Sequence, residues 1–127
     1  MTTVLVVEDE PDIRYLLRFM LTEDGFDVLE AEEGEEALAL LAEHAEIRLV
    51  VLDLRLPGLD GFAVLEQLKA TGAMGRLAVL VVSAHADTAV MEWTLEQGTA
   101  GFVRKPFKPA ELLAAVHGAL DRPLPAR

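Results

Sequence analysis

Five short apolar runs are spaced along the chain, at Val4–Val7, Asp27–Ala31, Leu49–Asp53, Ala78–Ser83 and Gly101–Lys105. The first, third and fourth runs are continuous rather than alternating, which is typical of strands buried on both faces of a parallel sheet. The second run contains Glu30, which favours a place at the edge of the sheet. The pattern therefore predicts a sheet with a buried centre and a more polar edge.

Between these runs, apolar residues recur at helical spacing, and each such stretch has a start signal or a stop signal. Pro11 suits a first helical turn, Gly34 opens the second pattern, Asp87 is typical of an N-cap, and Pro109 opens the last pattern. The residues expected on the inner helix faces are Ile13, Leu16, Leu17, Met20, Leu21, Ala37, Leu38, Leu40, Leu41, Phe62, Leu65, Leu68, Val90, Trp93, Thr94, Gln97, Leu112, Leu113, Val116 and Leu120. This fivefold alternation predicts an α/β fold, a three-layer sandwich around a parallel sheet with right-handed crossovers.

Composition narrows the function classes. The 127 residues suit one domain, with 52% hydrophobic and 26% charged residues. The longest stretch without a formal charge, residues 77–86, is about half the ~20 residues that a membrane span needs, and no leader pattern opens the chain. The absence of cysteine excludes disulfides and thiolate zinc sites, and a cytoplasmic protein is expected. A net charge of −11 disfavours direct binding to nucleic acid.

Polar residues gather where the predicted strands end. Glu8 and Asp9 follow the first strand, Asp53 ends the third, Ser83 ends the fourth and Lys105 ends the fifth. In open α/β sheets, ligands bind beyond the carboxyl ends of the strands. The sequence thus predicts that three carboxylates, a hydroxyl and an ammonium group meet at one edge of the sheet.

Carboxylates held this closely repel one another unless a cation or protons join them. A few hard oxygen ligands with room for water suit Mg²⁺ better than zinc or calcium. Glu8 and Asp9 are therefore candidate magnesium ligands. The alternative is that they only complement the start of the first helix, where negative charge is favoured, and their positions alone do not decide between the two.

Asp53 is a candidate nucleophile. It ends an apolar run that belongs in the middle of the sheet, and an aspartate carboxylate can form an acyl phosphate with a phosphoryl donor. Mg²⁺ and Lys105 would neutralise the transferring group, and Ser83 could donate a hydrogen bond to it. The bond before Pro106 is a candidate for cis geometry.

Four segments, VVEDEP, LVVLDLRLPGLDG, VLVVSAHAD and GFVRKPF, together resemble the receiver (REC) domain of two-component response regulators. Their order and spacing carry the resemblance, which extends over about Thr3 to Leu120. It implies a flavodoxin-like fold with five parallel strands in the order 2-1-3-4-5. Residues 1–121 would form the domain, and residues 122–127 a proline-containing tail or linker stub.

The resemblance also implies roles for individual residues. Asp53 matches the phosphoacceptor, and the metal ligands would be Glu8, Asp9, Asp53 and the backbone carbonyl of Arg55. Ser83 and Lys105 match the hydroxyl and the lysine that contact the phosphoryl group. The implied donor is a sensor histidine kinase or a histidine phosphotransfer protein.

Phe102 falls at the family's aromatic switch position and would respond together with Ser83. Because Phe102 lacks a hydroxyl, its preference between the two states should depend on burial alone. Arg55 and His85 stand at positions that flank the phosphorylation site and would tune the lifetime of the acyl phosphate.

The output should pass through the surface of the fourth helix, the fifth strand and the fifth helix, which the resemblance implies. There Met91 and Leu95 are four residues apart and form a candidate patch for an effector domain, an effector protein or a second copy of the chain. The domain would be no enzyme beyond its own phosphoryl transfer and hydrolysis.

Two alternative functions fit the residues less well. A haloacid-dehalogenase type of hydrolase would need an acid at Arg55 and its nucleophile on the first strand. A pseudo-receiver would lack one of the acidic or lysine residues.

Overall fold

The computed structural model of the chain describes residues 1–121, and the predicted tail at 122–127 lies outside the described residues. The strands are β1 (Thr3–Val7), β2 (Asp27–Ala31), β3 (Ile47–Leu52), β4 (Ala78–Ser83) and β5 (Gly101–Arg104). The helices are α1 (Pro11–Glu23), α2 (Gly34–Glu43), α3 (Gly61–Ala70), α4 (Thr88–Glu96) and α5 (Pro109–Asp121). A short 3-10 helix, η1 (Ala73–Gly75), was not predicted.

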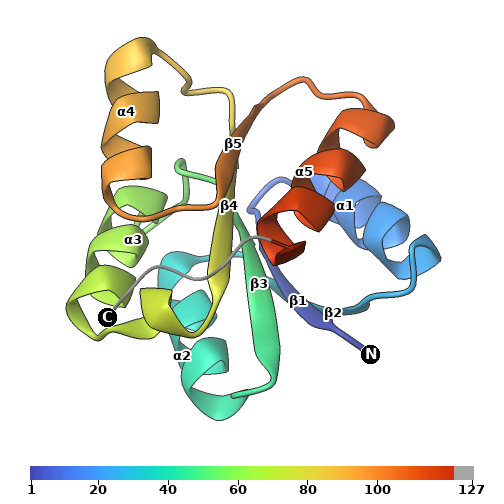
Figure 1. Ribbon diagram of the computed structural model, residues 1–127, viewed down its shortest axis with the longest axis horizontal. Helices are drawn as coiled ribbons and strands as arrows, with labels where there is room; N and C mark the ends of the chain where they lie inside the picture. Colours follow the sequence, from blue (N-terminus) through green and yellow to red (C-terminus); the bar gives the residue numbers. More distant parts are fainter. Residues whose placement is uncertain (122–127) are drawn as a thin grey trace.

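The five strands form one parallel sheet in the order β2-β1-β3-β4-β5. Helices α1 and α5 cover one face, and α2, α3 and α4 cover the other (Figure 1). The predicted α/β class, the three layers and the strand order are thus confirmed. The strand that contains Glu30 is an edge strand, as its polar residue indicated.

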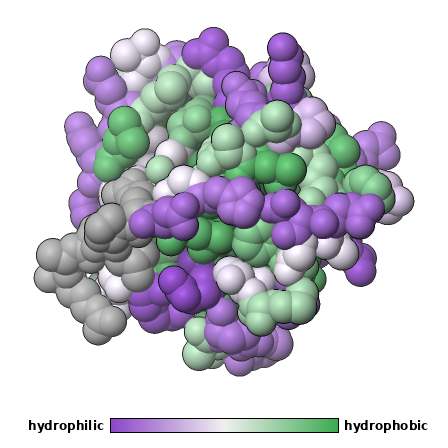
Figure 2. Space-filling model, turned by 45° about the vertical axis from the view of Figure 1, so that its right-hand side comes forward, coloured by the Kyte–Doolittle hydropathy of each residue, from purple (hydrophilic) through white to green (hydrophobic). Residues whose placement is uncertain are grey.

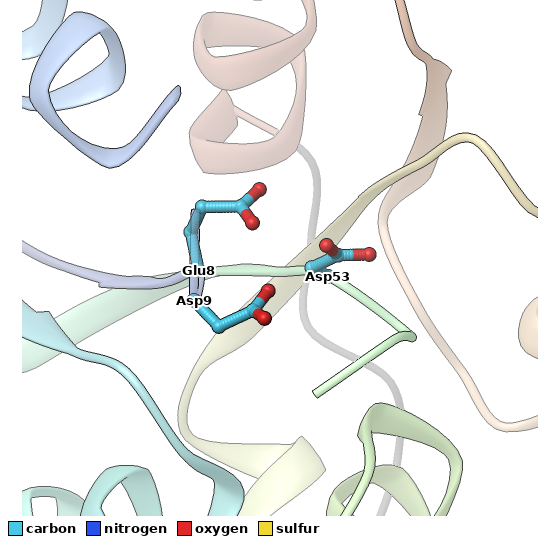
Figure 3. Close-up of side chains that lie close together, drawn as sticks. All are labelled: Glu8, Asp9 and Asp53. Carbon is cyan, nitrogen blue, oxygen red and sulfur yellow. The ribbon is translucent and has the colours of Figure 1, made fainter. Parts of the chain in front are cut away.

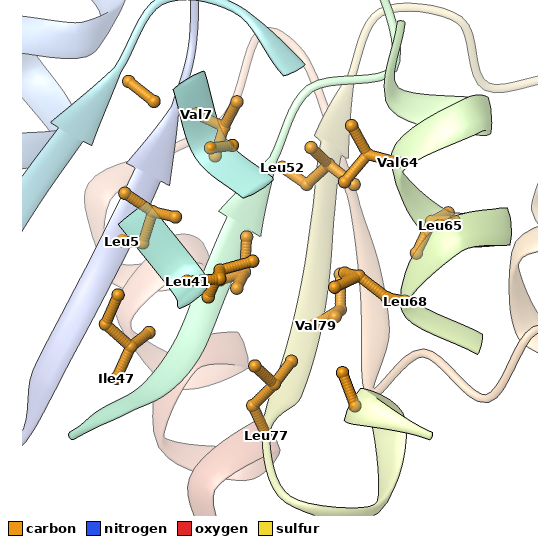
Figure 4. Close-up of a cluster of buried hydrophobic side chains, with 14 of the residues drawn as sticks. Leu5, Val7, Leu41, Ile47, Leu52, Val64, Leu65, Leu68, Leu77 and Val79 are labelled. Atoms are coloured by element: carbon orange, nitrogen blue, oxygen red, sulfur yellow. The ribbon is translucent and has the colours of Figure 1, made fainter. Parts of the chain in front are cut away.

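The continuous apolar runs are explained by two cores, one on each face of the sheet. Consecutive side chains of a strand point to opposite faces. In β1, Leu5 and Val7 therefore pack in the core beneath α2 and α3, whereas Val4 and Val6 pack beneath α1 and α5. Figure 4 shows the first core, in which Leu41 of α2 and Val64, Leu65 and Leu68 of α3 point toward the sheet.

The buried face of α1 is narrower than predicted. Leu17, Met20 and Leu21 are buried, but Leu16 is 42% exposed, so its assignment to the inner face is wrong. Leu16 instead lines a shallow apolar groove of about 350 Å³ together with Pro106 and Phe107. Helical spacing alone could not show that only part of the apolar stripe of α1 packs against the sheet.

Two of the strands that carry the site, β3 and β5, end one residue earlier than their apolar runs. β3 ends at Leu52 and β5 ends at Arg104, so Asp53 and Lys105 are the first residues beyond their strands.

Two helix starts near this edge are fixed by their caps. The Asp60 carboxylate accepts a hydrogen bond from the backbone N–H of Ala63 at 3.0 Å, and the predicted N-cap Asp87 accepts one from Val90 at 2.9 Å.

Candidate functional site

Pairing between β1 and β3 brings the acidic residues together. Val7 lies opposite Leu52 in the register, and the N–H of Asp53 donates to the carbonyl of Val7 at 3.1 Å. Glu8, Asp9 and Asp53 each offer a carboxylate oxygen, and these oxygens lie within 4.8 Å of one another. In Figure 3 the three carboxylates face a common space at the carboxyl edge of the sheet.

Lys105 reaches this cluster from the other end of the sequence. Its Nζ donates hydrogen bonds to Glu8 Oε1 at 2.6 Å and to Asp53 Oδ2 at 2.9 Å. The pairing of β5 with β4 delivers it, since the N–H of Lys105 donates to the carbonyl of Ser83 at 3.1 Å. The bond between Lys105 and Pro106 is cis, as the sequence suggested.

The pKa values of Glu8 and Lys105 are both shifted in this cluster. Glu8 is 1% exposed and Asp53 is 5% exposed. Burial of Glu8, reinforced by the charge of Asp53, raises the pKa of the Glu8 carboxyl to about 7 despite the bond from Lys105. Burial would lower the pKa of Lys105, but its hydrogen bonds to Glu8 and Asp53 outweigh burial and raise it. Lys105 is therefore a fixed positive charge at neutral pH.

The raised pKa of Glu8 predicts a pH dependence of stability in the metal-free protein. Between about pH 4.5 and 7 the unfolded chain releases the Glu8 proton while the folded protein keeps it, so stability falls as the pH rises through this window. The shift corresponds to a loss of about 3 kcal/mol from this group. Urea unfolding in the presence of a chelator, at about pH 5 and about pH 8, should show this loss in the wild type and little of it in Glu8→Gln.

The exposed residue Glu66 on α3 supplies the control for this comparison, since Glu66→Gln removes the same charge from a residue outside the cluster. That variant should follow the wild-type pH profile. Parallel profiles for the wild type and Glu8→Gln would contradict the assignment.

Ser83 and the residues after it lie beside the cluster. Ser83 is fully buried, and its hydroxyl oxygen accepts a hydrogen bond from the N–H of His85 at 3.1 Å. The N–H of Arg55 donates to Asp53 Oδ1 at 3.1 Å, so the main chain at this position lies against the carboxylate. The side chains of Arg55 and His85 both line an open hollow of about 520 Å³ that also contains Asp9. The structure thus gathers the predicted site residues at one edge.

The cluster has the donor chemistry of a site for a hard divalent cation. Its ligand atoms are carboxylate oxygens, and Asp9 borders an open hollow with room for water. The alternative of simple helix capping accounts for little of this geometry. The N-cap of α1 is Glu10, which makes no side-chain cap bond, and Glu8 contributes one hydrogen bond there, from Glu10 N–H to Oε2 at 3.2 Å.

The second predicted switch residue, Phe102, and the predicted output residues are not members of the carboxylate cluster. Phe102 is half-buried on β5 and packs against the core cluster beneath α2 and α3, with Trp93 of α4 packed against the same cluster. On α4, Leu95 is 58% exposed and Met91 is half-buried. Their roles as a switch and as a partner surface stay predictions.

Two features of α1 were not predicted from the sequence. Arg14 contacts the backbone that carries the acidic pair, and Tyr15 and Phe19 are 70% and 53% exposed. The face of the molecule drawn in Figure 2 likewise shows hydrophobic residues among hydrophilic ones. A recurrence of aromatic residues at positions four apart was visible in the sequence, whereas the contacts of Arg14 were not.

Comparison with known proteins identifies this arrangement. The family model described as the response regulator receiver domain matches residues 4–117. The chain is 40% identical to the alkaline phosphatase synthesis transcriptional regulatory protein PhoP of Bacillus subtilis, over 94% of this chain and 48% of that protein. It is 37% identical to the DNA-binding response regulator MtrA of Mycolicibacterium smegmatis, over 94% of this chain and 50% of that protein.

Solved structures agree. The non-phosphorylated HemR receiver domain from Leptospira biflexa has a TM-score of 0.89 and 31% identity, covering 100% of both chains. The chain therefore belongs to the receiver domains of two-component response regulators, and a phosphorylation-activated switch fits this family. This assignment argues against a hydrolase of the haloacid-dehalogenase type.

The chain spans about half the length of the curated relatives it matches. Among residues 1–121, no helix has both the length and the apolar character to cross a membrane.

Proposed function

We propose that this domain accepts a phosphoryl group on Asp53 from a phosphohistidine and passes the change to a partner through the surface of α4, β5 and α5. The donor would be a sensor histidine kinase or a histidine phosphotransfer protein in the cytoplasm. The observation that carries this proposal is the meeting of Asp53 with Lys105 and the acids Glu8 and Asp9 at the carboxyl edge of the sheet.

In the transfer, a carboxylate oxygen of Asp53 attacks the phosphorus, the new O–P bond forms as the P–N bond breaks, and the electron pair of that bond returns to the imidazole nitrogen. Lys105 is 2.9 Å from Asp53 Oδ2, so a small shift brings its ammonium group to a phosphoryl oxygen. Mg²⁺, held by Glu8, Asp9, Asp53 and the carbonyl of Arg55, would supply charge neutralisation for the transferring group.

After transfer, the added charge would draw the Ser83 hydroxyl toward the phosphoryl group and shift Phe102 with it. Arg55 and His85 border the hollow in front of the site, which suits side chains that regulate the access of water to the acyl phosphate. Hydrolysis of that bond, together with self-phosphorylation, would be the only catalysis.

The output partner would be an effector domain, an effector protein or a second copy of the chain that binds near Met91 and Leu95. The name of the relative MtrA describes a DNA-binding response regulator, and about half of that protein lies beyond the match. We propose that this domain controls such an output without contacting DNA itself, since its net charge of −11 repels phosphates.

Phosphorylation by a small donor tests the proposed acceptor. Incubation with acetyl phosphate and Mg²⁺ should add one phosphoryl group to the wild-type protein, as measured by intact mass, because the site holds both the nucleophile and the neutralising lysine. The variant Asp53→Asn should gain none, since an amide oxygen is a poor nucleophile and forms no acyl phosphate.

A matched control is available seven residues away. Asp60→Asn changes a neighbouring aspartate, and asparagine serves equally well as the N-cap of α3, so this variant should be phosphorylated as the wild type is. A phosphoryl group that still appears on Asp53→Asn would place the acceptor elsewhere.

A further inference from the structure

Arg14 is bound to the main chain of the acidic pair. It lies in α1, and its side chain is 17% exposed. Its Nη1 donates to the carbonyl oxygen of Glu8 at 2.9 Å and approaches the carbonyl oxygen of Asp9 at 3.4 Å. A single guanidinium therefore contacts the two consecutive peptide groups whose side chains face Asp53.

The guanidinium also pairs with two carboxylates. Its Nε lies 3.5 Å from Glu30 Oε1 at the end of β2, and its Nη2 lies 3.2 Å from Glu32 Oε1 just beyond that strand. Because the guanidinium is planar and its donors point in fixed directions, these contacts define its orientation. Arg14 thus connects the segment between β1 and α1 to the neighbouring edge strand.

This segment needs such support. Glu8, Asp9 and Asp53 place like charges within 4.8 Å of one another, and their repulsion favours outward movement of the turn that carries the first two. Lys105 contacts the side chains of Glu8 and Asp53, but no hydrogen bond of the described residues joins it to Asp9. The position of the Asp9 carboxylate then depends on its backbone, which Arg14 contacts.

We propose that Arg14 is a positioning residue, which holds the main chain of Glu8 and Asp9 so that their carboxylates meet Asp53 around a divalent cation. This inference rests on the metal site of the proposed function. Groups that orient metal ligands typically change metal affinity by about 10- to 100-fold when they are removed. Arg14→Met should accordingly raise the dissociation constant for a divalent ion about tenfold, and Arg14→Lys, which retains the charge and one donor group, should give an intermediate value.

Arg18 supplies a matched control on the same helix. Its Nη1 lies 3.0 Å from Glu30 Oε2, so it shares a carboxylate with Arg14, but in the described part of the chain it donates no hydrogen bond to the carbonyl of Glu8 or Asp9. Arg18→Met removes the same charge one helical turn away. Its affinity for the ion should stay within about twofold of the wild type, because exposed ion pairs contribute little.

The test is a titration with Mn²⁺, followed by electron paramagnetic resonance of the free ion, on the wild type, Arg14→Met, Arg14→Lys, Arg18→Met and Asp9→Asn. Thermal unfolding without metal shows which variants are folded at the temperature of the titration, and Arg14→Lys replaces Arg14→Met in the comparison if Arg14→Met is not folded.

The double variant Arg14→Met with Asp9→Asn adds a readout that general destabilisation would not change. If Arg14 acts through Asp9, its effect on affinity should largely disappear in the Asp9→Asn background.

The outcomes separate the two proposals. Weak and equal binding by the wild type and Asp9→Asn would remove the metal site, and the role of Arg14 with it. Tight binding that is weakened in Asp9→Asn but is equal in the wild type, Arg14→Met and Arg18→Met would overturn the role of Arg14 alone. Additive effects of Arg14→Met and Asp9→Asn would also overturn it.

Discussion

Replacing Lys105 with methionine should lower the free energy of unfolding of the metal-free protein by about 3–5 kcal/mol near pH 8. Among residues 1–121, no other side-chain cation lies within hydrogen-bond distance of the buried carboxylates of Glu8 and Asp53. The Glu8 carboxyl should respond by holding its proton to a higher pH than in the wild type, where its pKa is already raised to about 7. The loss should therefore be smaller near pH 5, where that proton is bound in both proteins. Urea unfolding with a chelator at the two pH values measures both effects.

Lys69→Met is the control for this experiment, because Lys69 is exposed in the last turn of α3. The free energy of unfolding of Lys69→Met should stay within about 0.5 kcal/mol of the wild-type value.

Added Mg²⁺ should raise the melting temperature of Lys105→Met more than that of the wild type, because in the variant the ion no longer competes with the ammonium group. Equal losses in the two lysine variants would show that Lys105 does not stabilise the buried carboxylates.

The layered fold could be predicted because its signals are local. Residues 4–7 and 78–83 are buried on both sides of the sheet, so they are apolar at every position or nearly so, and that pattern is visible without coordinates. Pro11, Gly34 and Asp87 mark helix starts for reasons of backbone geometry and capping that also act locally. The strand order came from the resemblance to a family and not from the pattern itself.

The candidate site was predictable for a geometrical reason. In a parallel sheet all carboxyl ends meet at one edge, so residues that follow separate strands become neighbours. Asp53 and Lys105 are far apart in the sequence, yet this rule brings their side chains to 2.9 Å. The rule predicts at which edge of the sheet the side chains meet, but not which of them form hydrogen bonds. The 2.6 Å contact between Lys105 and Glu8 was therefore not predicted.

Contacts between side chains and main-chain atoms could not be predicted from the sequence. Arg14 donates to two carbonyl groups, and every residue has a carbonyl, so no residue type marks the acceptor. The exposure of Leu16 was missed for a different reason. Which side of an apolar stripe meets the sheet depends on how α1 lies across it, and that follows from packing rather than from spacing.

Replacing Gly61 with alanine should destabilise the domain by about 3 kcal/mol and slow phosphorylation of Asp53 by at least about tenfold. Gly61 begins α3, and a Cβ there would overlap the carbonyl oxygen of Asp53 and lie 2.5 Å from the Cα of Leu54. Both neighbours are backbone atoms, which cannot turn aside as the end of a flexible side chain can. The added methyl group would therefore push the start of α3 away from the segment that carries Asp53, the proposed phosphoacceptor, and Asp53 would shift relative to Lys105.

Gly118→Ala separates this overlap from the general effect of replacing glycine in a helix. A Cβ at Gly118 of α5 would meet no atom within 4 Å, so this variant should be neutral or more stable by up to about 1 kcal/mol through helix propensity. Urea unfolding measures the stability of both variants, and the initial rate of mass gain with acetyl phosphate measures their phosphorylation. Since the carbonyl of Asp53 and the Cα of Leu54 belong to the segment that begins at the proposed phosphoacceptor, the loss of stability and the loss of phosphorylation rate in Gly61→Ala should occur together. A Gly61→Ala protein as stable and as rapidly modified as Gly118→Ala would mean that this segment moves aside without displacing the Asp53 carboxylate.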